Sequence, residues 1–293
     1  MDTRNTNERT EIADARRPAV DDWSALTTGE RVRYLELEGY LVLPDLLTAE
    51  QIGAIGAEVA ELPLTETDYS PHKKAADDLL GHDLPATLAT IALPATTAFL
   101  ERLFGDEVLF TSIAYQLCEP GHPGIAIHTD AQPYGSRIFG SLASSPVLMR
   151  VLYYLDDLTP ECSPFKVVPR SHLSVHYDAN PYNRFLRHEE EVMVTCRAGS
   201  AVVINQKVFH GNFPNFSDRD RRMLAIAYRP AWAGPVAEVD PWNEAQLAPL
   251  PPAARRFFQD PNTRRIDYDV PNRPDDLDRS SAGIAPSRWS AIE

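Results

Sequence analysis

The feature of the sequence that most constrains the fold is a series of short apolar runs between residues 107 and 230. Each run is rich in Val, Ile, Phe or Tyr, and turn signals such as Pro120-Gly121 and Asp156-Asp157 separate the runs. The runs read VLFTSIAYQL, GIAIHTD, VLMRVLYYL, FKVVP, EVMVTC, SAVVINQKVFH and RMLAIAYRP. Several short strands at this spacing predict a sandwich or barrel rather than alternating βαβ units. We therefore expect a mainly β core over residues 107–230.

Helical patterns dominate the region before this core, residues 21–106. Thr48 is followed by Gln51 in the spacing of a capping box, and apolar residues then recur at helical intervals. A second helical segment begins at Pro85, which suits a first helical turn because its missing N–H is not needed there. Pro94 predicts a kink or an interruption in that segment. We expect these helices to flank the β core.

The two ends of the chain have a different composition. Residues 1–20 are polar and charged, which predicts a disordered tail. Residues 231–293 are rich in Pro and Arg and predict an irregular extension with one helix near residues 252–258. Length alone allows one or two domains. We expect a single domain over residues 21–293.

Charge and cysteine content exclude several classes of protein. The chain has 28 Lys and Arg against 42 Asp and Glu, a net charge of −14, whereas a nucleic-acid binder needs a basic face. Its three cysteines are widely spaced and show no CxxC pair, which fits a reducing compartment. The sequence lacks a signal peptide and a long apolar run, so we expect a cytoplasmic protein without a membrane span. The oligomeric state stays open.

Two histidines and one aspartate carry the clearest chemical signal. If residues 125–130 form a strand, His128 and Asp130 project from the same face, with Thr129 facing away. His210 ends another apolar strand. Two His and one carboxylate form the facial triad of non-haem Fe(II) oxygenases. The alternative for the pair in the first strand is a surface histidine beside a solvated aspartate.

An arginine is expected beside such a triad if 2-oxoglutarate is the co-substrate. The far carboxylate of 2-oxoglutarate enters a partly dry site, where a bidentate guanidinium is its natural partner. Arg221 and Arg222 open the last strand of the β core, and alternation points one of them inward. We choose Arg221; the alternative is that both are solvated turn residues.

These residues belong to a wider set of motifs that resembles a known family. The matching motifs are GYLVLPDLLTAEQI, His128-Thr129-Asp130, YYLDDLTPECSPFKVVPRSH, and a final group of His210, Gly211, Asn212, Asn215, Ser217 and Arg221. Over residues 35–230 the chain resembles the phytanoyl-CoA dioxygenase-like family of Fe(II)/2-oxoglutarate oxygenases. The ordered combination is far more specific than any single motif.

The resemblance implies a fold, a cofactor set and roles for individual residues. It implies a double-stranded β-helix, a jelly roll of the cupin type, with Fe(II) held by His128, Asp130 and His210. It also implies O2 and 2-oxoglutarate as co-substrates, with Arg221 anchoring the far carboxylate. Asn212 stands where a small polar residue often assists.

The chain departs from the family pattern in two turns. Cys162-Ser163 replaces an Asn-Gly pair, and Arg170 replaces a glycine. Glycine in such turns serves the backbone conformation, so the strand path or the substrate entrance is expected to differ locally. Asp130 is present, whereas related halogenases lack the carboxylate. Hydroxylation or oxidative rearrangement is therefore favoured over halogenation.

Two further polar residues interrupt apolar strands. Gln116 lies on the strand before the histidine–aspartate motif and faces either the co-substrate or solvent. Arg150 lies inside PVLMRVLYYL, where a charge must find a partner or line a cavity. We predict Arg150 as a substrate or co-substrate contact.

Other candidate substrate contacts lie at the expected mouth of the barrel. Tyr134 and Arg137 follow the histidine–aspartate motif, and Trp232 and Trp242 come from the C-terminal extension. For each aromatic residue the alternative is simple packing. Lys73-Lys74 is assigned to a loop, as a solvated pair or as a contact to an anionic substrate.

Together these features predict a non-haem Fe(II)/2-oxoglutarate-dependent dioxygenase that hydroxylates or oxidatively rearranges a small molecule or a natural-product intermediate. A coenzyme A thioester is less favoured because the chain shows no basic patch for its phosphates. One alternative is a cupin-like metal-dependent isomerase or hydrolase that uses Zn or Mn without 2-oxoglutarate. The other is a non-catalytic binding protein of the same fold.

Overall fold

A computed structural model describes residues 16–67, 69–105, 107–128, 148–173, 187–231 and 242–259. Most of the predicted N-terminal tail and of the predicted C-terminal extension lies outside these residues. None of the described helices is both long and apolar enough to cross a membrane.

The described secondary structure is mainly β, with helices before and after the core. The strands are β1 (Tyr40–Leu43), β2 (Thr65–Thr67), β3 (Ser70–Asp77), β4 (Val108–Cys118), β5 (Ile125–His128), β6 (Met149–Tyr154), β7 (Phe165–Val167), β8 (Val192–Val194), β9 (Ala201–Asn205), β10 (His210–Asn212) and β11 (Arg221–Pro230). The α-helices are α2 (Thr28–Glu38), α3 (Ala49–Val59), α4 (Pro85–Ala89), α5 (Pro94–Phe104), α6 (Glu244–Leu247) and α7 (Pro252–Arg255). Short 3₁₀ helices are η1 (Trp23–Ala25), η2 (Leu79–Gly81), η3 (Thr90–Ala92) and η5 (Arg256–Phe258).

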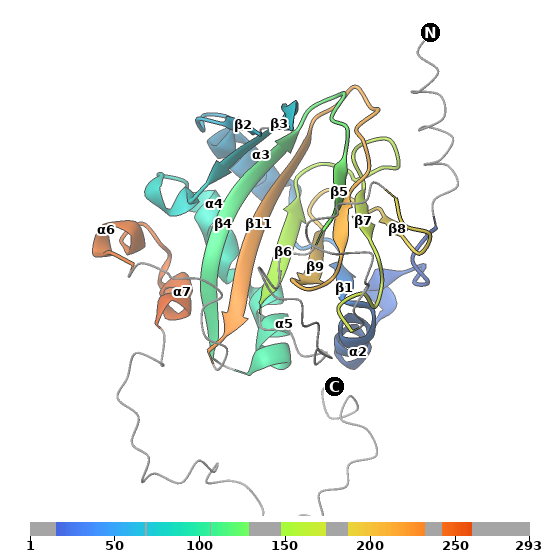
Figure 1. Cartoon of the computed structure of the whole chain (residues 1–293). Coiled ribbons are helices and arrows are strands. Elements are labelled where there is room, and N and C mark those ends of the chain that lie inside the picture. Colours follow the sequence, from blue (N-terminus) through green and yellow to red (C-terminus); the bar gives the residue numbers. More distant parts are fainter. Residues whose placement is uncertain are drawn as a thin grey trace, which may run out of the picture.

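The strands form two antiparallel sheets that face each other (Figure 1). The large sheet has the order β1-β9-β6-β11-β4-β3-β2 and the small sheet the order β5-β10-β7-β8. One apolar cluster joins the sheets, with Tyr154 and Met223 from the large sheet and Phe165 and Val194 from the small one. The non-consecutive strand order and the two facing sheets are those of a jelly roll. The predicted fold is therefore confirmed.

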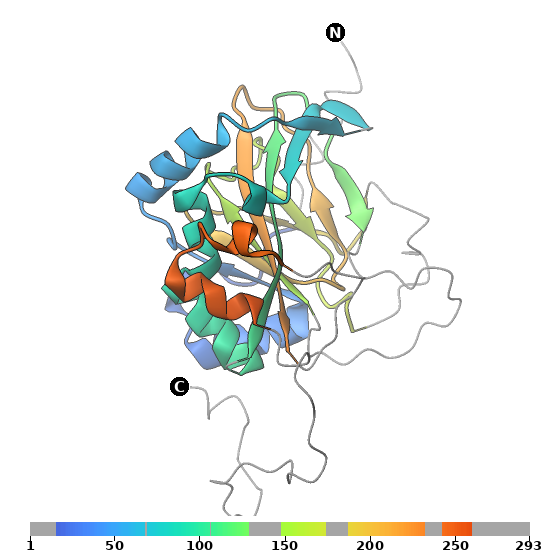
Figure 2. The same cartoon turned by 90° about the vertical axis from the view of Figure 1, so that its left-hand side faces the viewer.

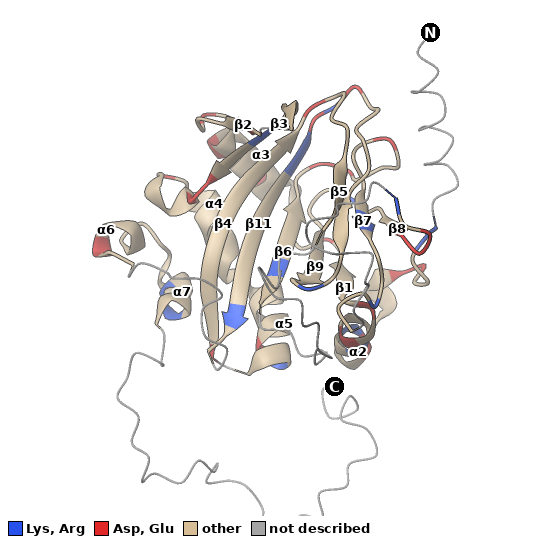
Figure 3. Cartoon of the chain, viewed as in Figure 1, with Lys and Arg blue, Asp and Glu red and all other residues tan. Residues whose placement is uncertain are grey.

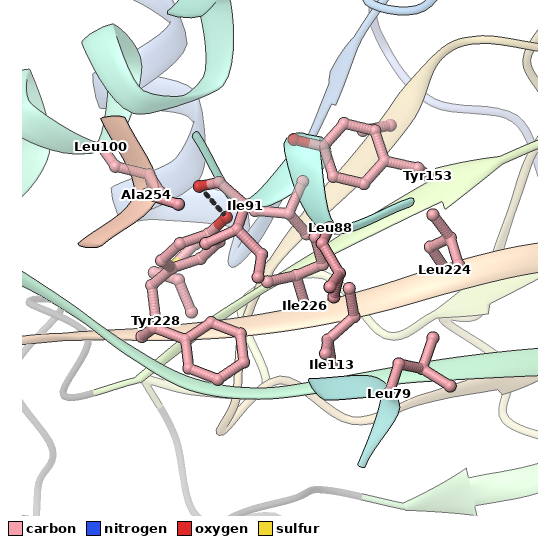
Figure 4. Close-up of a cluster of buried hydrophobic side chains, with 14 of the residues drawn as sticks. Leu79, Leu88, Ile91, Leu100, Ile113, Tyr153, Leu224, Ile226, Tyr228 and Ala254 are labelled. Atoms are coloured by element: carbon pink, nitrogen blue, oxygen red, sulfur yellow. Dashed lines mark hydrogen bonds between the residues drawn. The ribbon is translucent and has the colours of Figure 1, made fainter. Parts of the chain in front are cut away.

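The helices cover the opposite, outer face of the large sheet (Figure 2). A second apolar cluster fills this layer and includes Leu88 and Ile91 from the helical region and Ile226 and Tyr228 from β11. The hydroxyl of Tyr228 donates a 2.8 Å hydrogen bond to the carbonyl of Ile91, which ties β11 to η3 (Figure 4). This layer holds the large sheet rigidly from behind.

The predicted helix signals are confirmed in this layer. Thr48 and Gln51 form the capping box that starts α3. Pro85 and Pro94 each begin a helix, and the chain between them passes through η3. Pro94 interrupts the segment because it cannot donate the hydrogen bond that a continuous helix requires.

The prediction that Lys73 and Lys74 lie in a loop is wrong. Both residues lie in β3, which pairs with β4 so that Lys73 stands opposite Cys118. Lys74 points outward and forms a 2.6 Å ion pair with Glu119, whereas Lys73 is 3% exposed. The assignment failed because two adjacent charges resemble a solvated loop, whereas strand alternation sends them to opposite faces.

The two turns that depart from the family pattern keep a backbone conformation that favours glycine. Ser163 has a φ of 48° and Arg170 a φ of 66°. Left-handed residues of this kind cost about 1–2 kcal/mol when they carry a side chain. Each turn therefore has a left-handed residue that carries a side chain, at a cost in stability.

Candidate active site

Two histidines from different strands of the small sheet lie side by side. His128 ends β5 and His210 begins β10, and the two residues stand directly opposite each other in the antiparallel pair. Their ring centroids are 4.5 Å apart at an interplanar angle of 42°. Because directly paired residues point to the same face, both rings project toward the same point.

Backbone carbonyls set the tautomer of both neutral rings. Nδ1 of His128 donates to the carbonyl of Ala126 at 2.9 Å, and Nδ1 of His210 donates to the carbonyl of Val208 at 3.0 Å. A carbonyl can only accept, so each neutral ring carries its lone pair on Nε2. The ring of Phe165 stacks on His210 with centroids 5.7 Å apart. A ring oriented by an Nδ1–H bond to the backbone is typical of a metal-binding histidine.

The third predicted ligand lies outside the described residues. Asp130 follows β5 by two positions, and Tyr134, Arg137 and Trp232 are likewise outside the described ranges. Within those ranges no group of three His, Cys, Asp or Glu side chains is placed to hold a metal ion. The complete triad stays a prediction.

Arg221 is the buried member of the arginine pair. Its side chain is 0% exposed, with Nη2 3.0 Å from the sulfur of Cys118 and Cζ 5.7 Å from the ring centroid of Tyr154. Its Nε is buried without a hydrogen-bond partner, and no ion pair joins it to a carboxylate of the described residues. Arg222 points outward and donates to the carboxylate of Asp156 from Nε and from Nη2. A buried guanidinium without a counter-charge is unfavourable, and it strongly favours the binding of an anion.

A second buried cation stands beside Arg221. Lys73 donates a hydrogen bond to Oε1 of Gln116, and its position in β3 is opposite Cys118. Burial lowers the pKa of Lys73 to about 8, and the nearby charge of Arg221 lowers that pKa as well. We call Lys73, Gln116, Cys118, Tyr154 and Arg221 the cation cluster. Gln116 was a candidate from the sequence, whereas Lys73 was assigned to a loop, as part of a solvated pair or as a contact to an anionic substrate.

A buried histidine borders the cation cluster. His122 is 0% exposed, accepts a hydrogen bond at Nδ1 from the amide of Gly124, and has Nε2 3.2 Å from the hydroxyl of Tyr69. Burial lowers the pKa of His122 to about 3, and Arg221 and Lys73 lower that pKa further. The ring is therefore neutral at pH 7 and adds no third positive charge.

Asn212 lies in the same strand as His210 and is buried. It lies two positions after His210 in β10, on the same face, and its amide donates to the carbonyl of Ser163 at 3.4 Å. Between them, Gly211 approaches β5 so closely that a Cβ atom would lie 2.3 Å from the carbonyl oxygen of Ile125. A glycine at this position lets the two strands carry both histidines together.

Arg150 and Trp242, two further candidates, lie on different faces of the large sheet. Arg150 shares the inner face of β6 with Leu152 and Tyr154, which belong to the cluster between the sheets. Trp242 packs on the outer face, with its ring centroid 5.7 Å from that of Phe110. A position for Trp242 at the mouth of the barrel is therefore wrong, and simple packing describes it.

Comparison with known proteins gives one family and several related structures. The family model of phytanoyl-CoA dioxygenase (PhyH) matches residues 35–223. The protein Dioxygenase trt7 of Aspergillus terreus is 24% identical over 217 residues, which cover 69% of this chain and 73% of the relative.

Two proteins with known crystal structures, HygX and SnoN, have the same fold. HygX from Streptomyces hygroscopicus, with nickel, 2-oxoglutarate and hygromycin B bound, has a TM-score of 0.59 at 18% identity, over 70% of this chain and 88% of HygX. The epimerase SnoN, in complex with Fe3+, alpha ketoglutarate and nogalamycin RO, has a TM-score of 0.58 at 20% identity, over 76% of this chain and 95% of SnoN.

Proposed function

The chain belongs to the phytanoyl-CoA dioxygenase family and is an Fe(II)/2-oxoglutarate-dependent oxygenase, and we propose that its described histidine pair and cation cluster are the two halves of that active site. His128, His210 and Asp130 hold the iron. Arg221 and Lys73 bind the far carboxylate of 2-oxoglutarate. The site lies in one domain that spans residues 21–293.

The chemistry of the donor atoms fits ferrous iron. Two neutral imidazoles with their lone pairs on Nε2, together with one carboxylate, are the donor set of non-haem Fe(II) oxygenases and would leave positions on the metal open for the co-substrate and O2. His128 and His210 are held by backbone carbonyls at 2.9 and 3.0 Å, so both rings are oriented before the metal binds. Asp130 lowers the net charge of the site.

The buried cations carry the proposal for the co-substrate. Arg221 is 0% exposed and Lys73 is 3% exposed, and no ion pair with a carboxylate of the described residues compensates either one. Such a pair is costly to bury, and the dianion 2-oxoglutarate removes that cost when it binds. Tyr154, Phe165 and Met223 belong to the apolar cluster between the two sheets. The ring of Phe165 stacks on His210, whereas the ring of Tyr154 and the sulfur of Met223 lie near the guanidinium of Arg221. The histidine pair and the cation cluster therefore face the same interior.

A metal site without 2-oxoglutarate explains less of this arrangement. A cupin-like isomerase or hydrolase needs the metal ligands but has no use for two buried cations at the end of the barrel. A binding protein that has lost its chemistry has no reason to keep both imidazoles in the metal-binding tautomer. The cation cluster is therefore the observation that favours an oxygenase.

The substrate is a small molecule that undergoes hydroxylation or oxidative rearrangement. Iron with 2-oxoglutarate and O2 supplies, when bound, the oxidative decarboxylation to succinate and CO2 that makes a C–H bond reactive. The residues of this chain orient the co-substrate, exclude water from the inner face and position the substrate. HygX and SnoN, crystallised with hygromycin B and nogalamycin RO, support a natural-product substrate.

Adjacent lysines provide a matched test of the co-substrate site. Lys73→Met removes the inward charge and Lys74→Met the outward one, which is paired with Glu119. We expect Lys73→Met to weaken 2-oxoglutarate binding to the Ni(II)-loaded protein by about tenfold or more, measured by calorimetry, and Lys74→Met to leave it unchanged. Succinate release in air, with Fe(II) and 2-oxoglutarate present, tests the oxygenase activity itself. Equal affinities of the two variants, or no 2-oxoglutarate binding by the wild type, would contradict the proposal.

A further inference from the structure

Two loops cover the end of the barrel at which the cation cluster lies. One loop, residues 119–124, follows Cys118 at the end of β4, and the other, residues 213–220, leads to Arg221 at the start of β11. Cys118 and Arg221 stand opposite each other in the large sheet, so both loops leave it at the same end. Figure 3 shows basic residues of β3 and of the start of β11 at this end. The charges of the cation cluster therefore lie next to the two loops.

Hydrogen bonds join the two loops to each other. The amide of Gly121 donates to the carbonyl of Asn215 at 3.0 Å, and the amide of Asn215 donates to the carbonyl of His122 at 2.9 Å. Gly124 approaches β10 so closely that a Cβ atom would lie 2.7 Å from the carbonyl oxygen of Asn212. We call the two joined loops the cap of the barrel.

His122 is the buried side chain of the cap that borders the cation cluster. It is 0% exposed. Burial and the charges of Arg221 and Lys73 lower the pKa of His122 to about 3, so the ring is neutral at pH 7. The imidazole therefore adds bulk rather than charge to this end of the site.

Contacts on both nitrogens hold the ring of His122 in place. Nδ1 accepts a hydrogen bond from the amide of Gly124 at 3.2 Å, so Nε2 carries the proton and donates to the hydroxyl of Tyr69 at 3.2 Å. The ring of Tyr69 also packs edge-on against the imidazole, with centroids 6.0 Å apart. The imidazole cannot swing aside without losing these contacts, so it forms a fixed wall.

A 2-oxo acid in the proposed site has to span the distance between two fixed points. One point is the histidine pair, which the pairing of β5 with β10 holds in register. The other is the guanidinium of Arg221 at the start of β11, with the wall of His122 beside it. A carbon chain that is one methylene longer would push its far carboxylate past the cations and against the imidazole. The distance between the two points therefore selects for chain length.

We propose that His122, held by Gly124 and Tyr69, sets the length of the 2-oxo acid, so that the five-carbon diacid is accepted and the six-carbon diacid is rejected. This inference rests on the proposed oxygenase function and adds a specificity-determining residue to its co-substrate site. Forcing an additional methylene into a closely packed interior displaces side chains and backbone, which is unfavourable. A single methylene changes affinity by about tenfold or more when the surrounding wall cannot yield.

A matched pair of 2-oxo acids tests this inference on the full-length protein loaded with Ni(II). Calorimetry gives the affinities for 2-oxoglutarate and for 2-oxoadipate, and the wild type should prefer 2-oxoglutarate by about tenfold or more. His122→Ala opens space behind the cations and should remove most of that preference by raising the affinity for 2-oxoadipate. His122→Phe keeps a ring of similar size and should keep the preference, because the wall acts through its bulk.

Two further variants separate chain-length selection from a loss of stability. His172→Ala removes another buried histidine, one that lies beside Gly39 and outside the cap, and should leave the preference unchanged. Tyr69→Ala removes one of the contacts that hold the imidazole and should weaken the preference by about threefold. Because the side chain of Tyr69 is exposed, this variant decides the question if His122→Ala does not fold.

Several results would overturn the inference. A wild type that binds both acids equally has no limit on chain length. A preference that is unchanged in His122→Ala, or in Tyr69→Ala if the former does not fold, places the limit elsewhere. An equal loss of affinity for both acids in His122→Ala assigns the residue a structural role. A wild type that binds neither acid refutes the proposed oxygenase function itself, which is thus recognised separately.

Discussion

The two faces of β11 have opposite chemical character, although they alternate along one strand. Leu224, Ile226 and Tyr228 point outward into the helical layer and are all 0% exposed. Arg221 and Met223 point inward, where a buried guanidinium lies against sulfur atoms and an aromatic ring. The outer face is filled with apolar contacts, whereas on the inner face Arg221 has no ion pair with a carboxylate of the described residues. This contrast indicates that the outer face raises the free energy of unfolding, whereas the inner face lowers it in favour of ligand binding.

The largest expected effect is on the outer face. Ile226→Ala removes a buried side chain from the helical layer and should lower the free energy of unfolding by about 2–5 kcal/mol. The 2-oxoglutarate affinity of the folded variant should stay within about twofold of the wild type, because the substitution does not touch the cation cluster. Denaturant unfolding and calorimetry measure the two quantities. A large loss of affinity at unchanged stability would show that the faces are not separate.

A buried charge on the inner face should behave in the opposite way. Arg221→Met keeps the volume and removes the uncompensated charge, so the protein without ligand should gain about 1 kcal/mol or more in free energy of unfolding. The same variant should lose about 2 kcal/mol or more of 2-oxoglutarate binding free energy. If Arg221→Met instead lowers the free energy of unfolding of the ligand-free protein, Arg221 stabilises the fold.

The pH dependence of co-substrate binding sharpens the same contrast. Burial lowers the pKa of Lys73 to about 8, so the ammonium of the ligand-free protein loses its proton as the pH rises through that value. Since 2-oxoglutarate needs the charged form, its affinity should fall about tenfold between pH 7 and pH 9. Lys73→Arg stays charged in this range and should flatten the profile. Parallel profiles for the two proteins would assign the titration to another group.

The smallest effect concerns a turn away from both faces. Arg170→Gly relieves a φ of 66° and should raise the free energy of unfolding by up to about 1 kcal/mol, after the entropy of glycine and the loss of a surface ion pair with Glu38. Gly39→Ala is the matched opposite change, because Gly39 has a φ of 83° and a Cβ would lie 2.5 Å from Nδ1 of His172. A destabilised Arg170→Gly would indicate that the ion pair outweighs the strain.

Local signals allowed the fold to be predicted from the sequence. Thr48 with Gln51 and the two prolines, Pro85 and Pro94, act within a few residues, so the helices that they begin follow directly from the chain. The runs of Val, Ile and Tyr in the β core act in the same way, because alternation and turn residues are local properties. The jelly roll itself required the family resemblance.

The site was only partly predictable because its neighbours are distant in sequence. Alternation predicted that one of Arg221 and Arg222 points inward, the family resemblance favoured Arg221, and the structure places Arg221 inward and Arg222 outward. Lys73 was assigned to a loop because its burial depends on pairing with Cys118, which no local pattern reveals. His122 follows a turn signal, yet contacts with Tyr69 and Gly124 bury it completely.

Anaerobic titration of the protein with Fe(II) and 2-oxoglutarate tests the central claim most directly. Chelation of iron by 2-oxoglutarate at the histidine pair should produce a weak visible charge-transfer band in the wild type. The band should be absent in His210→Ala, whose backbone pairing with His128 does not depend on the imidazole. A wild type without the band at saturating iron and 2-oxoglutarate, or a His210→Ala variant that keeps it, would contradict the account.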